Sequence, residues 1–133
     1  MKQEEKDLLI KDLCSRLPYG VKVSCIDDFN HDWYNLELVD VKDNEAYIST
    51  YEPYYSNKYV DIENIRPYLF PLESMTEEQD KEFALLQTSP GQEGFLYAWN
   101  CATMMKWLIE NNFDYNGLIP KGLAKDASGK NIY

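Results

Sequence analysis

The side chains with the most obvious potential for chemistry are a single histidine and the acidic residues around it. His31 lies beside Asp27, Asp28 and Asp32, and clustered carboxylates are ligands that hard divalent cations prefer. This segment lacks the fixed glycine and the distal glutamate of a calcium-binding loop, so we interpret it as a polar hairpin loop. The sequence therefore predicts no metal site and no cofactor.

The three cysteines, Cys14, Cys25 and Cys101, are the other candidates for chemistry, because a thiol that meets His31 in space could act as a nucleophile. We expect Cys101 on the core-facing side of a helix, where a thiol behaves as a small hydrophobic group. No orienting or oxyanion motif accompanies it. We therefore predict a non-enzymatic protein and keep a small enzyme of unknown class as the last of three hypotheses.

The best candidate binding site is a cluster of aromatic residues in the middle of the chain, which has eleven tyrosines in all. Aromatic pockets hold cationic or planar ligands through the ring quadrupole. Tyr47 belongs to this cluster. The alternative is cross-strand tyrosine pairing on a solvent-facing sheet. The candidate binding residues are Trp33, Tyr34, Tyr51, Tyr54, Tyr55 and Tyr59.

The formal net charge of −10 bears on the kind of partner. No basic patch is present, so direct binding to a nucleic-acid backbone is disfavoured. An acidic surface confers solubility, or it fits a protein partner with a basic surface. The second hypothesis is therefore an acidic inhibitor that mimics nucleic acid, with Glu77, Glu78, Asp80 and Glu82 as the phosphate mimics. The alternative for these four residues is a solvated helix face.

The chain begins with charged residues rather than a signal peptide, and no apolar run approaches the length of a membrane span. Its odd number of cysteines without paired spacing fits a reducing compartment. We therefore predict a cytoplasmic protein without a membrane segment. Tyrosine-rich sheet edges often pair between molecules, so the sequence is compatible with a dimer, although no residue pattern requires one.

Hydrophobic periodicity predicts an α+β fold in a single domain, 1–133. An N-terminal helix occupies 1–19, antiparallel strands occupy 20–70, and two C-terminal helices with a tail of turns occupy 71–133. The strands predict a small twisted antiparallel sheet or an SH3-like barrel. We expect four or five strands, over 21–25, 33–41 and 46–51 and in an extended piece that begins at 59–62. Val39 and Val41 suggest a shift of face or a bulge.

The second half of the chain should pack against the first. Ser74 and Glu77 fit a capping box at the start of a helix that runs to about Gln87, and Thr76 with Gln79 is the alternative register. The helix over 95–111 is apolar over a wide arc, so we expect it to be largely buried. We expect the segment 67–71, with a proline at each end, to fold both helices back onto the sheet around a shared core.

Residues 20–70 resemble a Tudor-type, SH3-like barrel. The resemblance rests on Gly20-Val21-Lys22-Val23, on Trp33-Tyr34 and on Ile65-Arg66-Pro67. In such barrels, aromatic residues on the loops bind the ligand. The resemblance therefore implies the same role for the tyrosine cluster.

The two ends and the centre of the chain also resemble a family of small uncharacterised proteins encoded by gut-bacterial phages and mobile elements. The matching stretches are 13–23, 65–69, 74–78, 107–108 and 113–124. This resemblance implies a phage or mobile-element setting and no particular activity. Together with the charge, it makes a non-enzymatic binding or accessory protein with a protein partner the leading hypothesis.

Overall fold

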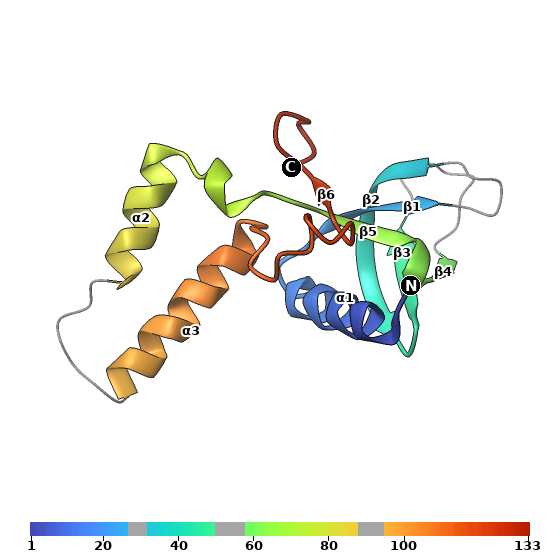
Figure 1. Cartoon of the computed structure of the whole chain (residues 1–133), viewed down its shortest axis with the longest axis horizontal. Helices are drawn as coiled ribbons and strands as arrows, with labels where there is room; N and C mark the ends of the chain where they lie inside the picture. Colours follow the sequence, from blue (N-terminus) through green and yellow to red (C-terminus); the bar gives the residue numbers. More distant parts are fainter. Residues whose placement is uncertain (27–31, 50–57, 88–94) are drawn as a thin grey trace.

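The computed structural model describes residues 1–26, 32–49, 58–87 and 95–133, and it confirms the predicted α+β class (Figure 1). Helix α1 is followed by a meander of strands, and two further helices come after the last long strand. The elements are α1 (Gln3–Arg16), β1 (Lys22–Ile26), β2 (Asp32–Lys42), β3 (Glu45–Ser49), β4 (Lys58–Asp61), η1 (Ile62–Asn64), β5 (Ile65–Leu69), η2 (Leu72–Ser74), α2 (Glu77–Gln87), α3 (Phe95–Glu110) and β6 (Lys125–Asp126).

The strands form one open, mostly antiparallel sheet in the order β4-β3-β2-β1-β5-β6. The predicted bulge in β2 is present, since the pairing of β2 with β3 shifts register between Leu38 and Asp40. Leu38 is buried and its neighbour Val39 is 47% exposed. The sequence left open a small twisted sheet or an SH3-like barrel, and the structure has an open sheet with β4 and β6 at its edges.

The tail contributes a strand that the sequence analysis missed. Lys125 and Asp126 pair in parallel with Tyr68 and Leu69 of β5, and the backbone N–H of Ala127 donates to the carbonyl of Leu69 at 2.8 Å. A two-residue strand of charged residues has no hydrophobic alternation, so no sequence pattern marks it.

Helix α1 packs on one face of the sheet and forms the main core with it. Leu9 and Leu13 of α1 are fully buried, and they belong to one cluster with Val23, Ile48 and Ile65 of the strands. The tail also contributes to this cluster. Its buried residues include Leu118, Leu123 and Ala124.

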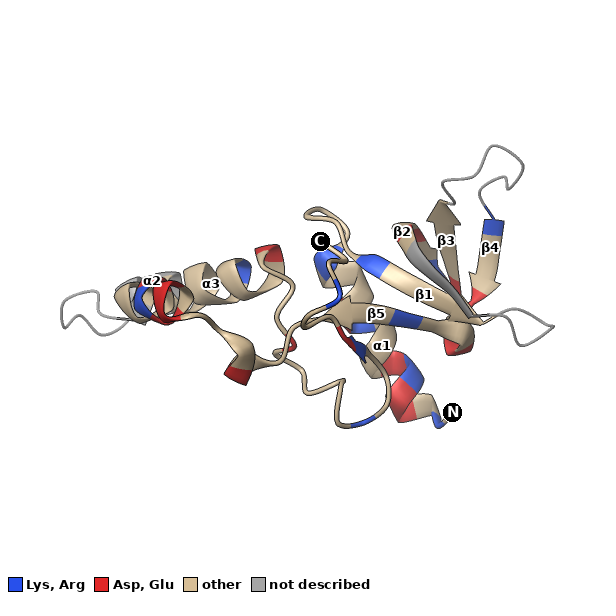
Figure 2. Ribbon diagram, turned by 90° about the horizontal axis from the view of Figure 1, so that it is seen from above, with Lys and Arg blue, Asp and Glu red and all other residues tan. Residues whose placement is uncertain are grey.

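Helices α2 and α3 form a hairpin that extends to one side of the sheet, as Figures 1 and 2 show. The hairpin has its own hydrophobic cluster around Trp107, Leu108 and Phe113. The prediction of one shared core is therefore wrong. Neighbouring residues on an extended chain point in opposite directions, so Leu69 enters the sheet core while Phe70 packs with the hairpin.

Helix α2 begins with the alternative capping register. The backbone N–H of Thr76 donates to Gln79 Oε1 at 3.0 Å, and the N–H of Gln79 donates to Thr76 Oγ1 at 3.1 Å. The hydroxyl of Ser74 instead donates to the carbonyl of Pro71 at 2.6 Å. The prediction of a Ser74–Glu77 box is wrong because Ser74 lies in the short helix η2, one turn before α2.

A buried ion pair joins α1 to the segment that follows α3. Arg16 Nε lies 2.7 Å from Asp12 Oδ1, and both side chains are fully buried. Arg16 Nη2 also donates to the carbonyl of Phe113 at 2.8 Å, and Asn116 Nδ2 donates to Asp12 Oδ2 at 2.9 Å. The Tyr115 ring covers the guanidinium at 5.0 Å. This Asp12–Arg16 node fixes the base of the hairpin to the sheet body.

Candidate functional site

The tyrosine cluster predicted as a binding site is described only in part. Tyr51, Tyr54 and Tyr55 lie outside the described residues. Trp33 and Tyr34 lie on β2, where only their backbone is described. Tyr59 on β4 is directly opposite Tyr47 on β3.

Tyr47 and Tyr59 adopt the cross-strand pairing that is the alternative to an aromatic pocket. The ring centroids of Tyr47 and Tyr59 are 4.7 Å apart with a tilt of 37°. Tyr59 is 50% exposed. The two rings therefore form a cross-strand pair at the β4 edge of the sheet, while a pocket that includes the other five candidate residues stays a prediction.

The structure exposes a hydrophobic surface that the sequence analysis did not anticipate. Cys101, Ala102 and Met105 of α3 are exposed, and Met105 retains 42% of its accessible surface. We call these three residues the α3 stripe. The expectation that this helix is largely buried, with Cys101 facing the core, is wrong for this part of it.

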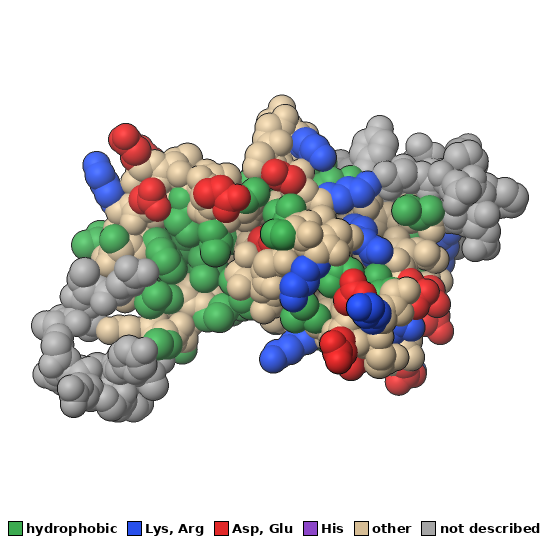
Figure 3. All heavy atoms as spheres, in the orientation of Figure 1, with side chains coloured by type: hydrophobic (Ala, Val, Ile, Leu, Met, Phe, Trp, Pro, Cys, Tyr) green, Lys and Arg blue, Asp and Glu red, His purple; other side chains and the backbone are tan. Residues whose placement is uncertain are grey.

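The physical reason is that α3 has two apolar faces and α2 covers one of them. Trp107 packs against Phe83 of α2, with ring centroids 5.4 Å apart. Cys101 and Met105 lie on another row, one turn apart, and the next residue in that row, Ile109, is buried. The α3 stripe therefore continues from a buried end into solvent. Figure 3 shows hydrophobic side chains gathered over the two helices.

Helix α2, the other helix of the hairpin, presents a different kind of surface. Four acidic side chains and Lys81 are exposed on it, and Figure 2 shows the acidic residues in red. The acidic residues are Glu77, Glu78, Asp80 and Glu82. Their exposure fits a solvated helix face and also leaves them available to a basic partner.

The described residues form neither an activated cysteine nucleophile nor a metal site. Cys25 is buried, whereas Cys14 and Cys101 are exposed. Partial burial, with a smaller effect of the Asp40 carboxylate, raises the pKa of the Cys14 thiol, which reduces its thiolate population and hence its reactivity. Within the described ranges, no group of three or more His, Cys, Asp or Glu residues could hold a metal ion. His31 lies outside these ranges.

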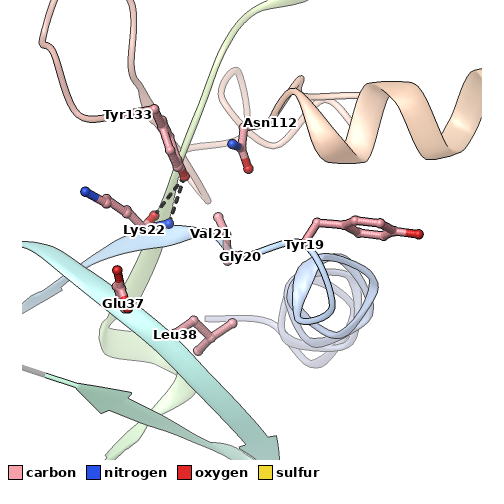
Figure 4. A pocket seen from close by; sticks show the side chains of 8 residues that line it. All are labelled: Tyr19, Gly20, Val21, Lys22, Glu37, Leu38, Asn112 and Tyr133. Atoms are coloured by element: carbon pink, nitrogen blue, oxygen red, sulfur yellow. Dashed lines mark hydrogen bonds between the residues drawn. The ribbon is translucent and has the colours of Figure 1, made fainter.

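A cavity of about 230 Å³ lies where the hairpin, the sheet and the C-terminus meet (Figure 4). The hydroxyl of Tyr133 forms part of its wall. It accepts the backbone N–H of Lys22 at 2.8 Å and donates to the carbonyl of Tyr68 at 2.8 Å. Tyr133 as a whole is 47% exposed, but these bonds enclose its hydroxyl. Burial raises the pKa of Tyr133 from 10.0 to about 12, with smaller opposing effects from Lys22 and Arg16.

This raised pKa predicts a loss of stability at alkaline pH. Below pH 10 both states keep the Tyr133 proton, so the free energy of unfolding does not depend on it. Between the unfolded pKa of 10.0 and the folded pKa of about 12, the folded state binds more protons, so stability falls as pH rises. Urea unfolding of wild type and Tyr133→Phe across this range measures the effect. The difference in stability between the two proteins should shrink with rising pH, and a constant difference would show that the hydroxyl titrates normally.

The comparisons with known proteins add no assignment. No protein-family model, curated protein or solved structure matches the chain. In the part of the chain that the structure describes, no helix is long and apolar enough to cross a bilayer. A functional proposal therefore depends on the surfaces of the molecule.

Proposed function

We propose that this chain is a non-enzymatic, cytoplasmic binding or accessory protein of a phage or mobile element, and that it binds a protein partner through the α3 stripe. The single observation that carries the proposal is the exposure of Cys101, Ala102 and Met105 on a helix whose next turn, Trp107 to Ile109, is buried. Contiguous apolar surface on a soluble protein commonly marks an interaction site. The phage or mobile-element setting rests on the sequence resemblance alone.

The chemistry of the stripe favours a well-packed but adaptable contact. Met105 has an unbranched and polarizable side chain that adapts to the shape of a partner. Cys101 and Ala102 are small, so a partner side chain or helix can approach the α3 backbone closely. An amphipathic segment that lays its apolar face against α3 would use a common mode of peptide recognition.

The charge of the chain favours a basic partner. The net charge of −10 repels a nucleic-acid backbone and opposes association with a second, equally acidic copy. The exposed acidic residues of α2, the neighbour of α3 in the hairpin, would attract Lys and Arg side chains. The proposed partner is therefore a protein segment with an apolar face flanked by basic residues.

The inhibitor hypothesis keeps one observation in its favour, the four exposed carboxylates on α2. A nucleic-acid mimic binds mainly through charge, so its affinity falls steeply with salt. Binding through the α3 stripe depends mainly on apolar contact and should change little with salt. The salt dependence of partner binding therefore separates the two functions.

The Met105→Glu variant tests the proposed surface. We expect it to lose at least tenfold in partner affinity, because a carboxylate would be desolvated at the contact, and we expect its stability to stay within ~0.5 kcal/mol of wild type. Affinity capture from the host lysate, followed by titration of the purified partner, measures this effect.

Leu72→Glu is the matched control for that experiment. Leu72 lies on η2 and is 44% exposed, close to the 42% of Met105, and its replacement changes charge and polarity in the same way. We expect this variant to bind as wild type does. Equal binding by both variants would overturn the assignment of the site to α3, and equal loss by both would show a charge effect that does not depend on position.

A further inference from the structure

The cavity between the hairpin and the sheet contains a polar group without a partner. Asn112 follows the last turn of α3, and only 9% of its surface is exposed. Among the described residues, its side-chain oxygen Oδ1 is buried and accepts no hydrogen bond. A buried acceptor without a donor destabilises the protein unless a ligand or water supplies the bond.

The backbone conformation makes the choice of asparagine informative. Asn112 has φ of +60°, in the left-handed region that glycine adopts with the least strain. Glycine would end the helix here equally well and would leave no unpaired oxygen. The backbone alone therefore does not explain the side-chain amide.

The amide faces a space of suitable size. In Figure 4 the amide of Asn112 and the hydroxyl of Tyr133 converge on the space over Gly20 and Val21. The cavity of about 230 Å³ has the volume of about eight water molecules. Such a space accommodates a small polar group on a short aliphatic stem.

The walls indicate which polar group fits. Lys22 and Glu37 both line the cavity and are directly opposite each other on β1 and β2, so their opposite charges compensate and the rim favours a neutral ligand. The Tyr133 hydroxyl already donates to Tyr68 and accepts from Lys22. Val21 and Leu38 provide an apolar base, since both are buried.

We infer that this cavity is a binding site for a neutral carboxamide on a short aliphatic stem. The ligand N–H would donate to Asn112 Oδ1, and its carbonyl would accept from the Asn112 NH₂ group, because an amide offers one acceptor and two donors. The stem would lie on Val21 and Leu38. Oδ1 has almost no accessible surface, so the amide turns about its broad terminal torsion to meet the ligand.

The test is an NMR titration of the ¹⁵N-labelled full chain with N-acetylglutamine methylamide. A ligand of about fourteen heavy atoms should bind with a Kd on the order of 1 mM, and saturable shifts should appear at the amides of Gly20, Val21 and Asn112. The methionine analogue has a similar shape without the side-chain amide and should bind at least tenfold more weakly. Equal shifts with both compounds, or no saturable shift with the glutamine compound, would overturn the proposal.

Two variants assign the effect to the Asn112 side chain. Asn112→Gly keeps the left-handed conformation and should weaken binding at least tenfold. Asn131→Gly is its matched control, because Asn131 also has positive φ, +51°, and is exposed; it should bind as wild type does. Should Asn112→Gly fail to fold, Asn112→Asp replaces the NH₂ donor and is expected to show the same loss. Wild-type affinity in the folded Asn112 variant would refute the site.

This site is independent of the proposed function. Met105 does not line the cavity, so Met105→Glu should leave the glutamine titration unchanged. If Met105→Glu showed no saturable shifts with the glutamine compound, that result would contradict a site that depends on the Asn112 amide and not on the α3 stripe. The two proposals can therefore fail separately.

Discussion

Replacing Arg16 with alanine is expected to destabilise the protein by about 3–5 kcal/mol, because the substitution leaves the Asp12 carboxylate buried without its counter-ion. Both side chains are fully buried, and Arg16 Nε lies 2.7 Å from Asp12 Oδ1. Arg16 also donates to the backbone of Phe113, so the substitution weakens the attachment of the hairpin as well. Urea unfolding followed by circular dichroism measures the change.

The chain offers a matched control for this prediction in Lys106 and Glu110. This pair has the same i,i+4 spacing at 3.6 Å, but its side chains are 61% and 41% exposed. Exposed pairs of this kind contribute about 0.3–0.5 kcal/mol, so Lys106→Ala should be nearly neutral. A loss in Arg16→Ala no larger than in Lys106→Ala would refute the structural role of the Asp12–Arg16 node.

Trp107→Ala is expected to cost about 3–5 kcal/mol, the usual range for truncating a buried aromatic side chain. The Trp107 ring stacks on Phe113 at 5.5 Å with an angle of 12°, and it contacts Phe83 of α2 at 5.4 Å. Since Trp107 links α2 to the rest of the molecule, amide hydrogen exchange in α2 should accelerate more than exchange in β1.

Tyr59→Ala is the comparison for that substitution. Its ring also packs against another aromatic ring, that of Tyr47, but on the exposed surface of the sheet. Cross-strand pairs of this kind contribute roughly 0.2–1 kcal/mol. A loss in Tyr59→Ala equal to that in Trp107→Ala would show that the hairpin cluster contributes no more to stability than a surface pair does.

The sequence predicts those parts of the fold that depend on local pattern. The four-residue steps of Leu9, Leu13 and Leu17 mark α1, and the apolar run after Phe95 marks α3. The strands follow from their β-branched and aromatic residues. The register shift near Val39 is also predictable, since two valines out of phase with the preceding leucines require a change of face.

The parts that the sequence did not predict depend on contacts distant along the chain. Asp12 and Arg16 have the spacing of an ordinary surface ion pair, but they are fully buried and bind Phe113 and Asn116 of the segment after α3. Likewise, the width of the apolar arc on α3 indicates how much surface could be buried, but it does not specify how many neighbours the helix has. Here α2 provides one neighbour, and the row that contains Cys101 and Met105 remains in part exposed.

The candidate binding surfaces also depend on contacts that are distant along the chain. The tyrosine cluster was proposed from density along the sequence, and its described members, Tyr47 and Tyr59, form a cross-strand pair. The α3 stripe and the Asn112 cavity came from exposure and from an unpaired oxygen, which are properties of the folded molecule. The sequence does show that Cys101, Met105 and Ile109 form an apolar row of their own on α3. This row is the one sequence feature that could have predicted the α3 stripe.

Photo-crosslinking from the stripe itself tests the central claim most directly. Cys101 and Cys14 are both exposed, so a thiol-directed benzophenone can be attached at Cys101 in Cys14→Ser and at Cys14 in Cys101→Ala, which keeps the α3 stripe apolar. We expect illumination with the purified partner to give a crosslinked product from Cys101 and little or none from Cys14. Equal products from both positions, or a product from Cys14 alone, would contradict partner binding through α3.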